Sequence, residues 1–113
     1  MTGSEFVANY IMHDSLIDSV DVQEGGTRVV LMIDFAFWMQ NDYKELDPET
    51  GSIRVTFKDV SYYDLPEDAD WNEISILETS LENGRIKFAL MNDMTDEYLE
   101  LIIETNAVDV EIE

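Results

Sequence analysis

The chain is a series of short segments in which apolar and polar residues alternate, and the most apolar of them spans residues 28–39. At the two-residue period of a strand, the alternate residues from Val29 to Phe37 share one apolar face, and the opposite face is interrupted chiefly by Asp34. A strand that is apolar on both faces lies centrally in a sheet or is covered on both sides. We therefore predict that residues 28–39 form a central strand around which the rest of the chain is arranged.

The same alternation indicates further strands between turn signals. The paired glycines Gly25 and Gly26 predict a hairpin turn before the central strand, because glycine tolerates the positive φ angles of tight turns. Asn83-Gly84 predicts a second hairpin. We expect the central strand to pair with residues 53–63. The other predicted strands are residues 16–22, 73–81, 85–91, 97–105 and 108–112.

Four segments are less regular. Residues 6–12 fit either a short strand or a helical turn, and we favour the strand. For residues 72–80 we favour a strand, and a helix is the alternative. The apolar parity of residues 53–63 changes near Lys58-Asp59, which predicts a β-bulge there. Residues 3–6, Gly-Ser-Glu-Phe, resemble a cloning remnant as much as native sequence, and we assign them no function.

The whole pattern, with turn signals about every 8–12 residues, is typical of a sandwich or barrel. The length of 113 residues and the 45% of hydrophobic residues suit one domain with its own core. We predict a single all-β domain over residues 1–113, an antiparallel β-sandwich or partly open barrel of about seven or eight strands.

Charge is the most extreme property of the composition. The chain has 26 Asp and Glu residues against 6 Lys and Arg residues, a formal net charge of -20. Nucleic acids and anionic membranes would be repelled, so we expect neither as a partner. The charge favours a basic protein partner, a cation or high-salt solvent. A homo-oligomer is left open.

Cysteine usage and the first residues bear on the location of the protein. The chain has no cysteine, and its first residues lack the basic region and apolar run of a signal peptide. These features fit a reducing compartment, so we expect a cytoplasmic protein.

The single histidine lies in the run His13-Asp14-Ser15. Consecutive side chains of an extended chain point to opposite faces, so these residues do not form a nucleophilic relay. One histidine is also too few for a zinc or iron site. We interpret the run as a turn in which Asp14 or Ser15 accepts hydrogen bonds from nearby backbone amides.

Asp34 is the one carboxylate inside the most apolar segment. A buried carboxylate must be paired, hydrogen-bonded or protonated. We expect a structural role for it, near a strand edge or paired with Arg28, Arg54 or Lys58. The other carboxylates are so numerous that chance pairs are certain, and we predict no catalytic residue and no cofactor.

The residues from Asp68 to Asn72 have the opening spacing of a calcium loop. Such a loop needs Gly at its sixth position and Glu at its twelfth, but Glu73 and Thr79 stand there. We therefore predict no specific metal site.

Aromatic residues bracket the acidic loop 64–72. Aromatic side chains among carboxylates are typical of a protein-binding surface, on which Tyr and Trp anchor and the acids steer a basic partner. The alternative is that these rings cap the open ends of the core, and Tyr63 and Trp71 are the two that we expect to be exposed. The predicted partner-binding residues are Tyr62, Tyr63, Asp64, Glu67, Asp68, Asp70 and Trp71.

The segment Tyr10-Ile-Met-His-Asp-Ser-Leu-Ile17, followed by a glycine turn and a long apolar strand, resembles a group of small bacterial β-rich proteins. Members of this group open with a similar His-Asp-Ser element and are mostly uncharacterised. Some are described as immunity proteins of polymorphic toxin systems, which bind and silence a toxin. The resemblance covers chiefly residues 10–37. It implies a toxin as partner and no catalytic residues.

Three functions follow from these observations. The first is a non-enzymatic protein-binding domain, in the form of an immunity-type inhibitor that covers a basic surface. The second is a β domain of unrelated role whose acidity is an adaptation to high salt. The third is a cation-binding or enzymatic domain that uses pooled carboxylates.

Overall fold

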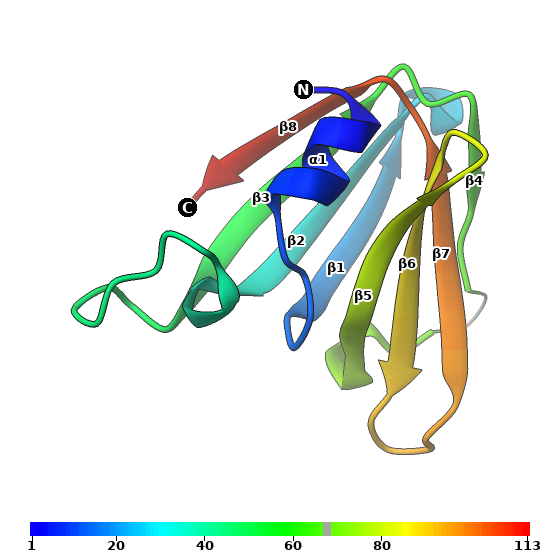
Figure 1. Cartoon of the computed structure of the whole chain (residues 1–113). Helices are drawn as coiled ribbons and strands as arrows, with labels where there is room; N and C mark the ends of the chain where they lie inside the picture. Colours follow the sequence, from blue (N-terminus) through cyan, green and yellow to red (C-terminus); the bar gives the residue numbers. More distant parts are fainter. Residues whose placement is uncertain (67–68) are drawn as a thin grey trace.

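The computed structural model describes residues 1–66 and 69–113. Eight antiparallel strands form one sheet that does not close, in the order β4-β7-β6-β5-β1-β2-β3-β8 (Figure 1). The predicted fold class is therefore confirmed. The strands are β1 (Leu16–Gln23), β2 (Arg28–Ala36), β3 (Thr50–Lys58), β4 (Tyr62–Asp64), β5 (Ile74–Glu82), β6 (Arg85–Asn92), β7 (Tyr98–Glu104) and β8 (Ala107–Ile112).

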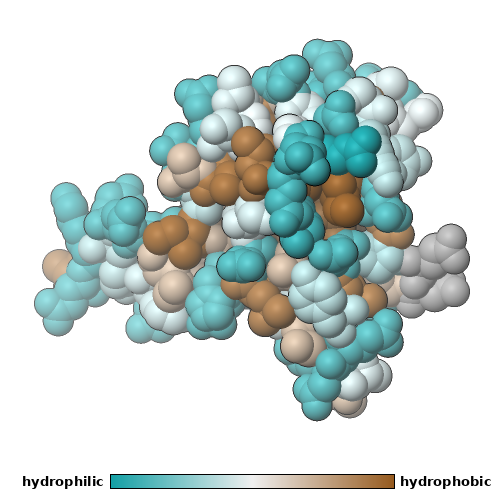
Figure 2. All heavy atoms as spheres, turned by 45° about the vertical axis from the view of Figure 1, so that its right-hand side comes forward, coloured by the Kyte–Doolittle hydropathy of each residue, from teal (hydrophilic) through white to brown (hydrophobic). Residues whose placement is uncertain are grey.

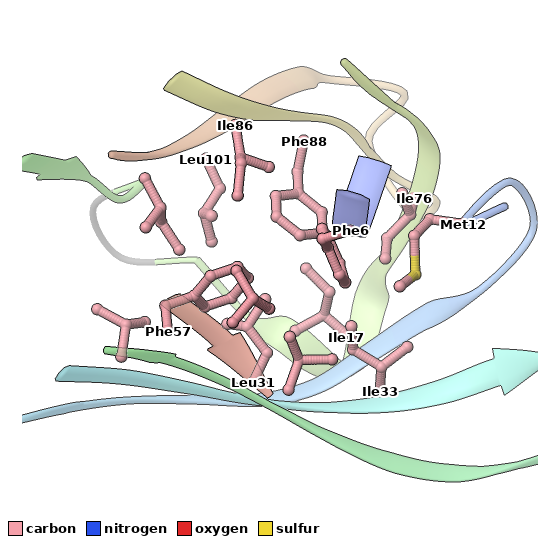
Figure 3. Packing of buried hydrophobic residues seen from close by; sticks show 14 of the residues in the cluster. Phe6, Met12, Ile17, Leu31, Ile33, Phe57, Ile76, Ile86, Phe88 and Leu101 are labelled. Atoms are coloured by element: carbon pink, nitrogen blue, oxygen red, sulfur yellow. The ribbon is translucent and has the colours of Figure 1, made fainter. Parts of the chain in front are cut away.

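The sheet bends between β1 and β5, which share the single register pair Leu16 and Ser75. We call β8-β3-β2-β1 the first half-sheet and β5-β6-β7-β4 the second half-sheet. Figure 3 shows the two halves facing each other, with side chains such as Leu31, Ile33 and Phe88 in the space between them. These side chains are fully buried, so the core lies between the half-sheets as in a sandwich.

The strand β2 is central to the first half-sheet, as predicted. It pairs with β1 on one side and with β3 on the other. Its inward residues Val29, Leu31, Ile33 and Phe35 are buried, whereas Val30 and the other alternate residues are half-buried on the outer face. The predicted length was too great, because β2 ends at Ala36 and the short 3₁₀ helix η2 (Phe37–Met39) follows.

Both predicted hairpins are confirmed. Gly25 and Gly26 have φ angles of 67° and 97° in the 3₁₀ turn η1 (Glu24–Gly26), which connects β1 to β2. Asn83 and Gly84, with φ angles of 52° and 79°, connect β5 to β6. The strand β5 also rules out the alternative helix over residues 72–80, where the helical part is only the 3₁₀ turn η3 (Trp71–Glu73).

The first segment is an α-helix, α1 (Gly3–Asn9), so the strand that we favoured there is wrong. Thr2 and Glu5 form a capping box: Glu5 N–H donates to Thr2 Oγ1 at 3.1 Å, and Thr2 N–H donates to Glu5 Oε1 at 2.9 Å. The helix turns Phe6 into the core, where its ring lies 5.7 Å from that of Phe57 and 6.1 Å from that of Phe88 (Figure 3). Residues 3–6 are therefore an integral part of the fold.

The predicted β-bulge near Lys58-Asp59 is wrong. Asp59 has a φ angle of 49° and ends β3 in a turn, after which Val60 N–H donates to Thr27 O at 2.8 Å. The change of parity in the sequence therefore marks a strand end. The register shifts of the sheet occur instead in β1, between Ile17 and Ser19, and in β5.

Candidate protein-binding surface

The run His13-Asp14-Ser15 connects the two half-sheets by hydrogen bonds. The buried Ser15 hydroxyl accepts a hydrogen bond from the Ala36 N–H of β2 at 2.9 Å, and Ser15 O accepts one from the Ile76 N–H of β5 at 2.8 Å. His13 Nδ1 lies 2.7 Å from Leu77 O. The predicted turn is confirmed. The Ser15 hydroxyl, however, accepts from the distant strand β2 and not from a nearby backbone amide. His13 Nε2 lies 3.5 Å from Asp14 Oδ1, so these two neighbouring side chains do meet, but the Ser15 hydroxyl is directed to Ala36 in the core.

Asp34 does not have the predicted ionic partner. It is half-buried on the outer face of β2, in register with Leu16 and Ser52, and none of the ion pairs in the described part of the chain includes it. Its charge instead faces Asp18, whose pKa is raised by partial desolvation and then by the charge of Asp34. The Asp34 side chain remains partly exposed because it lies on the outer face of β2.

Tyr62, Tyr63 and Asp64 form the edge strand β4, beside β7. The Tyr62 ring is half-buried under the Arg85 guanidinium, whose carbon lies 4.0 Å from the ring centroid. Arg85 Nε donates to Glu104 at 2.8 Å, which lowers the pKa of that carboxyl and leaves the cation compensated. Tyr62 is therefore held in place at the edge.

Tyr63 is the exposed aromatic residue of this edge, with 41% of its surface accessible. Its ring lies against Gly26, where a Cβ atom would come within 2.9 Å of Tyr63 Cε1. The close approach of β4 to the η1 turn thus fixes the position of the ring. The turn, Ser61 and the two tyrosines together line a shallow depression of about 330 Å³. The predicted exposure of Tyr63 is therefore confirmed.

The second part of the predicted site is not continuous with the first. Trp71 is half-buried and packs against the core together with Leu65 and Ala69, so its predicted exposure is wrong. Asp70 is exposed, and its carboxylate accepts from Asn72 N–H at 3.2 Å to cap η3. The strands β7 and β6 separate β4 from β5, to which η3 leads. Glu67 and Asp68 lie outside the described residues.

Four of the six Lys and Arg residues, on strands of the sheet, form ion pairs with carboxylates. These pairs are all exposed or partly exposed, so water and salt screen them and each contributes little to stability. Most carboxylates among the described residues therefore keep an uncompensated charge. The pairs are Arg54–Glu113, Lys58–Asp109, Arg85–Glu104, Lys87–Glu82 and Lys87–Glu100.

A second surface, at the end of β8, was not predicted. Phe37, Tyr43, Pro48 and Ile112 line an open pocket of about 280 Å³ with Gln40, Asp42 and Asp47. Figure 1 shows why they meet: the end of β8 lies next to the loop that leads from β2 to β3. The sequence holds no local signal for this meeting, since it depends on β8 pairing with β3.

The surface as a whole is hydrophilic with separate apolar patches. On the face in Figure 2, hydrophilic residues surround several hydrophobic patches.

Within the described residues, no three His, Asp or Glu side chains converge on a position for a metal ion. In the same part of the chain, no helix is long and apolar enough to cross a membrane.

Comparisons of the chain with models of protein families, with curated proteins and with solved structures gave no match.

Proposed function

We propose that this protein is a non-enzymatic binding domain that covers a basic surface of another protein. The observation that carries the proposal is the exposed Tyr63, held on Gly26 at a sheet edge and followed by the exposed Asp64, in a chain with a net charge of -20. A fixed aromatic ring loses little conformational freedom when it binds, and surrounding carboxylates raise the rate of encounter with a cationic partner.

The partner that suits this surface best is a cationic toxin with nuclease activity. A nuclease gathers positive charge at its active site because its substrate is a chain of phosphates. An acidic domain that occupies this site excludes the substrate and inhibits the enzyme. The resemblance of residues 10–37 to small bacterial β-rich proteins, some described as immunity proteins, supports the same choice.

Titration of the protein against a panel of cationic nucleases tests the proposal. We expect binding and inhibition of at least one nuclease, with an affinity that falls as salt is added. The variant Tyr63→Ala should weaken this binding by about tenfold or more, as loss of an interface anchor does. Absence of salt-sensitive binding to every nuclease would refute the proposal.

Tyr98→Ala is the matched control. Tyr98 is exposed to 51% and hydrogen-bonded to Glu100, so it is also a tyrosine beside a carboxylate, but it lies on β7 outside the proposed surface. Its removal should leave nuclease binding unchanged. Equal effects of the two variants would show that the β4 edge is not the contact surface.

A further inference from the structure

Among the residues that the structure describes, β8 is a terminal strand of the sheet, and its outer edge has backbone groups without partners. Glu113 N–H donates to Ser52 O of β3 at 3.0 Å, so Glu113 and the residues that alternate with it face β3. Val110 and Ile112, which lie between them, direct their N–H and C=O groups away from β3. In the part of the chain that the structure describes, no backbone group bonds with these two residues.

At Val108, two residues before Val110, the same edge is paired with the backbone of Met1. The Met1 amino group donates to Val108 O at 2.9 Å, and Val108 N–H donates to Met1 O at 2.8 Å. This is the reciprocal pair of bonds that an antiparallel neighbour makes. The edge is therefore geometrically able to take an added strand, and the open part begins where the contact with Met1 stops.

The open part of the edge borders the pocket at the end of β8. Ile112 is exposed to 74% and lines this pocket with Phe37, Tyr43 and Pro48. Phe37 is fixed there: its ring meets that of Phe35 at a centroid distance of 5.4 Å, and it covers Gly51 so closely that a Cβ atom would lie 2.6 Å from Phe37 Cε2. A preformed apolar site thus adjoins the unpaired backbone.

The two faces of β8 differ in chemistry. Val110 and Ile112 lie on the inner face with the pocket, whereas Asp109 and Glu111 lie on the outer face. No ion pair among the described residues includes Glu111. Asp42 and Asp47 add acidic groups at the pocket. A strand laid beside β8 therefore meets apolar neighbours at one parity and carboxylates at the other.

We propose that the edge of β8 binds an extended segment of the basic partner as a further strand of the sheet. Side chains of the segment alternate, with a Lys or Arg beside Glu111 and an apolar side chain in the Ile112 pocket. Asp109 already has Lys58 as its ionic partner. Backbone hydrogen bonds from Val110 and Ile112 supply affinity, and the two parities supply specificity. The inference rests on the proposed function for the positive charge of the partner. It adds a second contact surface, on the strand at the opposite end of the sheet order from Tyr63.

Charge argues against a second copy of this chain as the occupant. Antiparallel pairing of two β8 edges brings the Asp109 and Glu111 carboxylates of one copy next to those of the other. Like charges across a strand pair destabilise it, and each copy carries a net charge of -20. A basic segment replaces this repulsion with attraction.

The test uses a short labelled peptide in which lysine alternates with isoleucine or valine, and fluorescence anisotropy as the measurement. A scrambled peptide of the same composition, with its lysines contiguous, is the control for charge alone. We expect the alternating peptide to bind about tenfold or more tightly than the scrambled one. Equal affinities would overturn the inference.

The variant Val110→Pro removes one outward N–H and leaves the bonds to β3 in place, because proline is accepted on a strand edge. It should weaken peptide binding by about tenfold, the equivalent of a lost hydrogen bond, whereas Val110→Thr, which keeps the N–H, should bind as the original protein does. Unchanged binding by the proline variant would refute strand addition.

Methylation of the peptide backbone gives a test that leaves the protein intact, which matters if Val110→Pro unfolds. N-methyl groups on the residues that face β8 should abolish binding, and the same groups on the alternating residues should be tolerated. If both peptides bind equally, no strand is added. Sedimentation of the free protein measures its oligomeric state. If the protein is a dimer and Val110→Pro makes it a monomer, the edge of β8 binds a second copy of the chain, and the proposal is overturned.

Failure of this inference is distinguishable from failure of the proposed function. If Tyr63→Ala weakens nuclease binding while the alternating peptide does not bind, the function stands and strand addition falls. If the peptide binds but no nuclease does, strand addition stands, and the basic partner is of another kind.

Discussion

The Ser15 hydroxyl oxygen accepts a hydrogen bond from the backbone N–H of Ala36 at 2.9 Å, in a site closed to solvent. The backbone carbonyl of Ser15 also accepts the Ile76 N–H at 2.8 Å, so one residue connects β2 of the first half-sheet with β5 of the second. Only one register pair joins β1 to β5 in the described structure, and this serine therefore carries much of the junction.

Replacement of this serine should destabilise the protein. In Ser15→Ala the buried Ala36 N–H loses its acceptor, which should lower the free energy of unfolding by about 1–3 kcal/mol in urea denaturation. Ser19→Ala, at an exposed position of β1, is the control and should change that free energy by less than about 0.5 kcal/mol. A similar effect of both substitutions would show that the hydroxyl does not stabilise the junction.

Phe6 attaches α1 to the core, where its side chain is completely buried. Phe6→Ala leaves a cavity among the rings of Phe57, Phe88 and Tyr10, so the free energy of unfolding should fall by about 3–5 kcal/mol. Leu46→Ala serves as the comparison, because Leu46 is exposed to 98% and its loss should change stability by less than about 0.5 kcal/mol. A small effect of Phe6→Ala would mean that α1 does not dock in solution.

The hairpins could be predicted from the sequence because their signals are local. Gly25-Gly26 and Asn83-Gly84 require positive φ angles within the turn itself, and the flanking alternation fixes the strands. The helix α1 was missed for the opposite reason. It has seven residues, too few for stability from its own hydrogen bonds, and it depends on the distant contacts of Phe6.

The same distinction explains the outcome for the candidate site. The predicted exposure of Tyr63 is confirmed, because Tyr63 lies on the edge strand β4. The half-burial of Trp71 depends on how its loop packs against the core, and the β8 edge depends on strand order. Neither is a property of a short segment, so periodicity did not reveal them.

Asp18 and Asp109 should give opposite responses to pH. The raised pKa of Asp18, caused by partial desolvation and by Asp34, means that the folded state favours its protonated form. Its stabilising contribution is present below the unfolded value of 3.8 and is lost as pH rises through the folded value. Asp18→Asn should therefore raise the melting temperature at neutral pH and have no such effect below about pH 3.8.

Asp109 provides the contrast within the same experiment. A hydrogen bond from Lys58 lowers the pKa of its carboxyl, so its contribution to stability is present above 3.8 and disappears as pH falls through the folded value. Asp109→Asn should lower the melting temperature at neutral pH and leave it unchanged in acid. Shifts of the same sign for both variants at neutral pH would contradict the assigned environments.

Salt should stabilise the protein, because 26 acidic residues against 6 basic ones repel one another in the folded state. The screening length falls from about 30 Å at 0.01 M to about 8 Å at 0.15 M, so the melting temperature should rise over this range and then level off. The double variant Glu45→Gln/Glu49→Gln, in an exposed loop, should reduce the dependence on salt. A rise that continues into molar KCl would favour adaptation to high salt over partner binding as the reason for the acidity, because simple screening is complete well below that concentration. A flat response would show that the carboxylates are too dispersed to repel one another.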